Sequence, residues 1–100
     1  MPASLPLWFQ RTIREVARTG PVTADRLAAA FDVVIESDKM LIPVVFCPPC
    51  TVIVSDALRS AELEQMTLLG VSEAILCRAG QDYTREDVVC LLRGMQLLAA

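Results

Sequence analysis

The sequence predicts an α+β fold: a small, mainly antiparallel sheet of three to four strands packed with about four helices, in the order α-α-β-β-β-α-β-α. The first observation is the run Met40–Ser55, which carries no charge and is rich in Val and Ile. The second is that the flanking segments show apolar residues at helical spacing behind residues that cap helices. The length of 100 residues makes 1–100 a single domain.

Two short helices are expected at the start of the chain. Ser4 is placed to cap a first helix that runs to about Arg18, and Thr19-Gly20-Pro21 ends it. Thr23 is placed to cap a second helix over 24–31. The first helix would bury one apolar face, formed by Leu5, Phe9, Ile13, Val16 and Ala17.

Three strands follow, which we expect over 32–36, 41–46 and 51–54 and in an antiparallel meander. Pro43 lacks an amide hydrogen, so the second strand should lie at an edge or be bulged there. Residues 41–54 hardly alternate between apolar and polar. Both faces of the central sheet should therefore be covered, by helices or by a second subunit.

The C-terminal part predicts a third helix over 57–69 that Gly70 closes, a fourth strand over 74–77, and a last helix capped by Thr84. Leu63 and Met66 lie on the opposite side of the third helix from its other apolar residues. A helix with two apolar sides requires two neighbours, so these two residues are candidates for contact with a partner or for packing beneath a loop.

Composition favours a protein that binds other proteins. Hydrophobic residues make up 54% of the chain, charged residues 21%, and the mean hydropathy is +0.48. A domain this small cannot hide so much apolar surface, and exposed apolar patches mark interfaces. A homodimer, or a surface reserved for another protein, follows.

Charge and residue usage disfavour other classes. The net charge of −3 and the pI near 4.8 disfavour nucleic acid as a partner, although a local basic patch stays possible. The chain has no histidine, the usual general base and metal ligand. We find no catalytic constellation and no phosphate loop, and expect no enzyme activity, cofactor or metal.

The N-terminus lacks the basic lead-in and apolar run of a signal peptide, and the charge-free run is too short and too rich in proline to span a membrane. We therefore expect a cytoplasmic protein that does not contact membranes, with reduced cysteines.

The expected contact residues combine apolar anchors with one basic stripe. Trp8 is the single tryptophan, and Arg11, Arg14 and Arg18 recur on one side of the first helix, where they could equally form a solvated face. The predicted partner-binding residues are Trp8, Arg11, Arg14, Arg18, Leu63 and Met66.

The segment Ile13–Val33, IREVARTGPVTADRLAAAFDV, resembles the first two helices of bacterial helix-turn-helix and winged-helix domains. The resemblance implies a third helix after Val33 that enters the major groove of DNA. The residues themselves, with Glu36 and Asp38 in that place, predict a strand. A DNA-binding regulator is the first alternative, and it requires Arg11, Arg14, Arg18 and Arg26 to converge on one face.

The motif Cys47-Pro48-Pro49-Cys50 resembles the redox site of thioredoxin-like proteins. The resemblance implies that the first thiolate attacks a disulfide and the second resolves it, with a helix beginning at the first cysteine. Residues 51–54 instead predict a strand. A dithiol redox protein is the second alternative. A zinc site would need Cys77 and Cys90 to converge with this pair, whereas small core residues explain them more simply.

These observations together predict a small non-enzymatic regulator, of the inhibitor, antiactivator or adaptor type, that acts through protein–protein contact as a homodimer.

Overall fold

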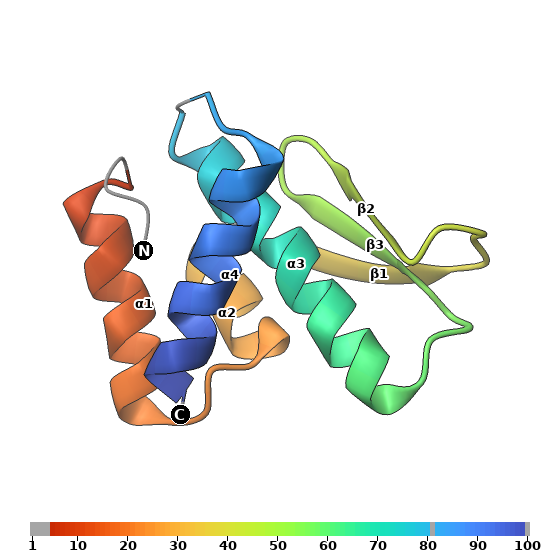
Figure 1. Ribbon diagram of the computed structural model, residues 1–100, viewed down its shortest axis with the longest axis horizontal. Coiled ribbons are helices and arrows are strands. Elements are labelled where there is room, and N and C mark those ends of the chain that lie inside the picture. Colours follow the sequence, from red (N-terminus) through yellow and green to blue (C-terminus); the bar gives the residue numbers. More distant parts are fainter. Residues whose placement is uncertain (1–4, 81, 100) are drawn as a thin grey trace.

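Four helices and a three-stranded mixed sheet form the fold, which confirms the α+β class. The computed structural model describes residues 5–80 and 82–99. The elements are α1 (Leu7–Thr19), α2 (Ala24–Phe31), β1 (Val34–Asp38), β2 (Val44–Cys47), β3 (Thr51–Ser55), α3 (Ser60–Arg78) and α4 (Arg85–Ala99). Figure 1 shows the strands extending to one side of the helices.

Helix α3 is the central element (Figure 1). One side of it packs on β2 and β3, and another side meets α2 and α4. Val71 and Ile75 of α3 are fully buried. The prediction that the third helix needs two neighbours is thus confirmed, and this arrangement places the hydrophobic core between the sheet and the other helices.

The N-terminal helices follow the sequence closely. Four of the five residues predicted for the apolar face of the first helix are buried, and Ala17 is half-buried. Leu5 lies just before α1, and the rings of Phe9 on α1 and Phe31 lie 5.2 Å apart between centroids. Thr23 caps α2, because its side chain accepts a hydrogen bond from the Arg26 amide at 3.3 Å. The cap predicted at Ser4 lies outside the described residues.

The predicted fourth strand is wrong, because residues 74–77 belong to α3. The prediction took Gly70 as the end of the helix, yet Gly70 sits inside it, against the sheet. A Cβ atom at this position would lie 2.5 Å from Cγ1 of Val52 and 3.0 Å from Cγ2 of Val44. Gly70 therefore lets the helix approach the sheet closely and does not end it.

The predicted antiparallel meander is also wrong in its pairing. The strand order is β1-β3-β2, with β1 parallel to β3 and β2 antiparallel to β3. Strand β3 is the most buried, with Val52 at 0% and Val54 at 3% exposure, and the centre of a sheet suits such a strand. Charges in β1 and prolines flanking β2 suit these two strands to the edges.

The proline prediction is confirmed in this arrangement. Strand β2 lies at an edge, and Pro43 immediately precedes it with its carbonyl accepting a hydrogen bond from the Ser55 amide at 2.9 Å. Strand β1 begins and ends two residues later than predicted.

The last helix begins as the sequence predicts. Thr84 and Asp87 cap α4 reciprocally, with the Asp87 amide donating to Thr84 Oγ1 at 3.3 Å and the Thr84 amide donating to Asp87 Oδ2 at 2.9 Å. Within the described ranges, none of the helices has the length and apolar character needed to cross a membrane.

Candidate functional site

The side of the sheet that faces away from α3 is largely apolar. Strand register places Val34, Thr51 and Cys47 in one row across the three strands, and Glu36, Ile53 and Val45 in the next row. We call these six residues the outer face. None of the six is buried, and Val34 is 47% exposed.

The opposite side of the sheet, the inner face, carries Val52 and Val54 at its centre and meets α3. Figure 1 shows that α3 and the other helices gather on one side of the strands, and in the described part of the chain no helix covers the outer face. The expectation that both faces are covered by helices is therefore wrong, and the alternative in that expectation, a second subunit, stays open.

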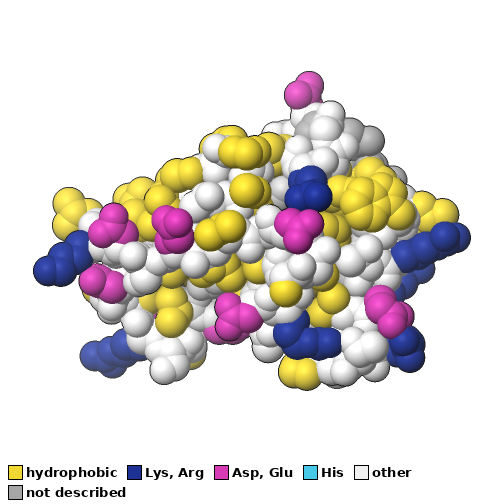
Figure 2. All heavy atoms as spheres, turned by 180° about the vertical axis from the view of Figure 1, so that it is seen from behind, with side chains coloured by type: hydrophobic (Ala, Val, Ile, Leu, Met, Phe, Trp, Pro, Cys, Tyr) yellow, Lys and Arg dark blue, Asp and Glu magenta, His cyan; other side chains and the backbone are white. Residues whose placement is uncertain are grey.

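The loop between β1 and β2 extends this apolar region. Leu41 is 106% exposed and Ile42 is 54% exposed. Lys39 is the one charged residue of this loop. Figure 2, which shows the molecule from behind, has hydrophobic side chains across its left half, where the sheet lies, with carboxylates below them. The surface thus has an apolar centre and an acidic border.

A cleft of about 440 Å³ lies beside β1, at the free edge of the sheet. It opens between the start of α2, the strand, and the first half of α3. Leu63 contributes an apolar side chain at 38% exposure. The residues that line it are Ala24, Asp25, Ile35, Glu36, Ser37, Val54, Ser60, Leu63, Glu64 and Thr67.

The cleft is acidic. Asp25 and Glu64 contribute carboxylates, Glu36 of the outer face borders the cleft from β1, and no Lys or Arg is among the lining residues. Glu64 is fixed in place, because its Oε1 and Oε2 accept from the Ala24 amide at 3.0 and 3.4 Å. That contact sits at the N-terminus of α2, where the helix dipole favours an anion.

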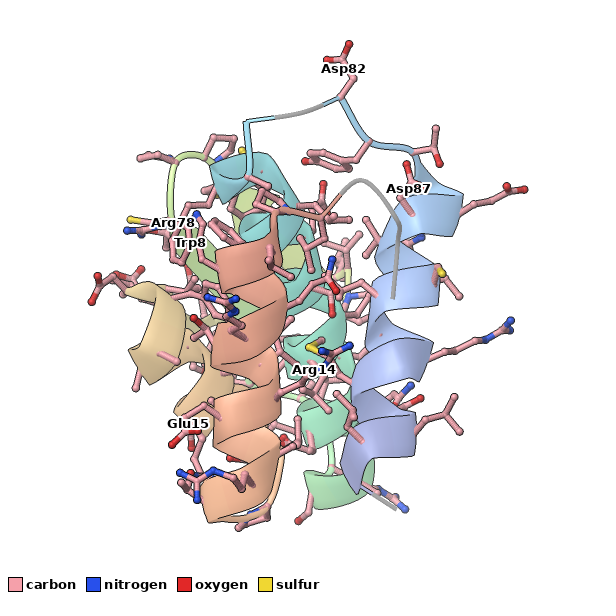
Figure 3. The ribbon with its side chains drawn as sticks, turned by 90° about the vertical axis from the view of Figure 1, so that its left-hand side faces the viewer. Trp8, Arg14, Glu15, Arg78, Asp82 and Asp87 are labelled. Carbon is pink, nitrogen blue, oxygen red and sulfur yellow. The ribbon has the colours of Figure 1, made fainter. Side chains whose placement is uncertain are left out.

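The predicted partner-binding residues are not brought together. Trp8, at 57% exposure, and Arg11, Arg14 and Arg18 are all exposed on α1. In Figure 3, Trp8 points toward the side of Arg78, whereas Arg14 points toward α4. Arg14 and the tryptophan therefore face different directions, and the contact of the stripe and of Trp8 with a partner stays a prediction.

One arginine of the stripe is already paired. Arg18 donates from Nε to Glu15 Oε2 at 3.0 Å, and its guanidinium also bonds Oε1. This hydrogen bond lowers the pKa of Glu15 and raises that of Arg18. Both groups lie in water, so the pair adds little to stability.

The two predicted contact residues of α3 behave differently. Leu63 lines the cleft, whereas Met66 is partly buried and packs against the core. The structure thus places Leu63 at an accessible site whose geometry could not be predicted from the sequence.

The arginines required for DNA binding are also separated. Arg26 turns into the corner between α1 and α2, where Nη1 donates to the carbonyls of Val16 at 2.9 Å and Pro21 at 2.7 Å. Residues 34–38 form β1, so the predicted strand is confirmed where the resemblance implied a third helix.

The cysteine pair lies in a β-hairpin. Cys47 ends β2, Cys50 immediately precedes β3, and both are half-buried free thiols. The strand predicted after the motif is confirmed, so the helix start that would activate a thioredoxin-like thiolate is replaced by an extended strand. Among the described residues, no cluster of Cys, Asp and Glu has the grouping of a metal site.

Comparison with known protein families, with curated proteins and with solved structures finds no match to this chain. Function is therefore argued from the outer face and the cleft alone. Sequence reasoning missed both sites. Four residues of the outer face, Val45, Cys47, Thr51 and Ile53, lie in the charge-free run 40–55, but their common side appears only once the register of the three strands is known.

Proposed function

We propose that this chain is a small non-enzymatic regulator, of the inhibitor, antiactivator or adaptor type, that acts by contacting another protein and works as a homodimer. The observation that carries the proposal is the outer face, an apolar sheet surface that no described helix covers. Apolar area left in water on a sheet is stabilised when a second surface packs on it.

A second copy of the chain is the occupant we propose for the outer face. Two sheets pack face to face at about 10 Å with their apolar side chains interleaved. A two-fold axis brings the same patch of each subunit together, so an apolar centre meets an apolar centre. Ile53 lies on the central strand and forms the middle of this contact, while Glu36 stays toward the rim and keeps its water.

The two alternatives have less support. Arg26 is held at a helix corner away from the α1 stripe, and Cys47 and Cys50 flank a turn between strands. Neither arrangement favours DNA binding or thiol exchange over protein contact.

Sedimentation velocity over a wide range of concentrations tests the dimer. We expect the wild-type chain to sediment as a dimer and Ile53→Asp to sediment as a folded monomer, because a charge at the centre of the contact cannot be desolvated cheaply. Ala30→Asp, at an exposed position of α2, adds the same charge elsewhere and should leave the dimer intact. A wild-type chain that stays monomeric at high concentration would contradict the proposal.

A further inference from the structure

Strand β1 offers a free edge to another chain. In its parallel pairing with β3, the Val34 amide donates to the Cys50 carbonyl at 2.8 Å, and the Asp38 carbonyl accepts from the Asp56 amide at 3.0 Å. Backbone groups of a parallel strand alternate between its two neighbours. Ile35 and Ser37 therefore turn their amide and carbonyl groups away from β3, toward the side where the described sheet ends.

The 440 Å³ cleft runs along this same edge. Ile35 and Ser37 line it from β1, and Leu63 and Thr67 line it from α3. An added strand at the edge would hence place alternate side chains over the cleft. Main-chain hydrogen bonds then supply affinity, and the cleft supplies specificity for the side chains, which is the mode of recognition called β-augmentation.

The charge of the cleft selects the occupant. The carboxylates of Asp25 and Glu64 line it, Glu36 borders it, and no cation is among the lining residues, so a basic side chain is attracted and a phosphate is repelled. A second copy is disfavoured at this edge, because β1 itself carries Glu36 and Asp38 and no Lys or Arg. Pairing two such strands places acids near acids, and like charges facing each other across strands destabilise a sheet.

We propose that the edge of β1 and its cleft bind an extended, basic segment of the partner protein as a fourth strand, with apolar side chains against Leu63 and a Lys or Arg between Asp25 and Glu64. This inference rests on the proposed function, since it names the chemistry of the partner. Its surface meets the outer face only at Glu36, which lies at the rim of the dimer contact, so a dimer can bind one segment on each subunit.

Fluorescence anisotropy with defined peptides tests the inference. The probe is a fluorescein-labelled peptide of alternating Lys and Val, compared with one in which Glu replaces Lys and with one that carries N-methyl groups on alternate amides. The lysine peptide should bind the wild-type chain, and the other two should not, because one reverses the charge and the other removes the strand's hydrogen bonds. Equal binding of the N-methylated peptide would overturn the inference.

Variants of the chain locate the peptide. Asp25→Lys should weaken binding by about tenfold, a charge effect at an interface. Asp82→Lys is the matched control, because Asp82 is exposed in the segment between α3 and α4, far from the cleft, and it should bind as wild type (Figure 3). Equal weakening by the two variants would mean that only net charge is sensed, and would overturn the inference.

Ser37→Pro tests the strand edge directly. It removes an amide that does not bond β3, so the sheet should persist while peptide binding is lost, and Ser37→Ala should bind normally. If Ser37→Pro disturbs folding, Leu63→Glu at an exposed position of the cleft provides a second test, with loss of binding expected. If the lysine peptide still binds to Leu63→Glu, or to a Ser37→Pro variant that folds, the inference is overturned.

The two proposals fail separately. A chain that dimerises through Ile53 but ignores all three peptides would overturn the inference about β1 and leave the dimer proposal standing. A wild-type chain that is monomeric yet binds the lysine peptide at β1 would overturn the dimer proposal and leave the inference about β1 standing.

Discussion

The two faces of the sheet differ in what covers them, although they are built from the same three strands. Val52 on the inner face is completely buried under α3, whereas Ile53, the next residue along β3, stays partly exposed on the outer face. Both are β-branched apolar residues on the central strand. The difference shows that the fold uses one face for its own stability and leaves the other partly in water, where we propose that a second copy packs.

The sharpest way to break this comparison is to place the same charge on each face. Val52→Asp should lower the free energy of unfolding by about 3–5 kcal/mol, because it buries a carboxylate without a partner. Ile53→Asp should change the stability of the monomer little. Urea unfolding followed by circular dichroism measures both, at a concentration low enough that dimer formation adds nothing. Equal losses for the two variants would show that the outer face is covered within the monomer.

The close approach of α3 to the inner face gives a second, smaller effect. Gly70→Ala should lower the free energy of unfolding by roughly 1 kcal/mol or more, because overpacking against Val52 costs about 1–3 kcal/mol and outweighs a gain of up to about 1 kcal/mol in helix propensity. Urea unfolding measures the loss. The double variant Gly70→Ala with Val52→Ala should lose less free energy of unfolding than the sum of the two single losses, because Val52→Ala makes room for the added methyl group. Additive losses would contradict the contact.

The connection between α3 and α4 also makes a pH-dependent contact with α3. The Tyr83 hydroxyl donates to Glu73 Oε2 at 3.0 Å, and burial together with this hydrogen bond raises the pKa of Tyr83 to about 12, above its ordinary value of 10.0. A raised pKa stabilises the fold fully below pH 10, and the stabilisation is lost as the pH rises from 10 through 12. Thermal unfolding between these values should show this loss in the wild-type chain and a smaller one in Tyr83→Phe.

Local signals in the sequence predicted the first two helices and the start of the last helix well. Thr23 and Thr84 cap the helices that they were expected to cap, and the apolar face of the first helix is buried. These features depend on residues a few positions apart, so the sequence contains them directly. A strand in place of a third helix was predicted over 32–36 from local residues in the same way, and it forms over 34–38.

The errors concern contacts between distant segments. Gly70 has the local character of a helix end, but its role is set by Val52 and Val44 across the core. The segment 74–77 has the composition of a strand and is held as helix by the sheet on one side and α4 on the other. Likewise, the parallel pairing of β1 with β3 depends on which strand takes the centre of the sheet, which no local pattern encodes.

The candidate site was predicted only in kind. Surplus apolar residues predicted an interface, and Leu63 was named among its residues. Of the other candidates, Met66 packs against the core and the remaining four lie on α1. The outer face and the cleft arise from strand register and from the approach of α2 and α3 to β1. Both are products of the tertiary fold.

An isotope-filtered nuclear Overhauser experiment tests the central claim most directly. In a mixture of labelled and unlabelled chains, we predict intermolecular contacts between the methyl groups of Ile53 and those of Val34 or Val45 in the other copy, which is possible only if the outer faces meet. A dimer whose contacts instead involve Trp8, or a sample with no intermolecular contacts at millimolar concentration, would contradict the account.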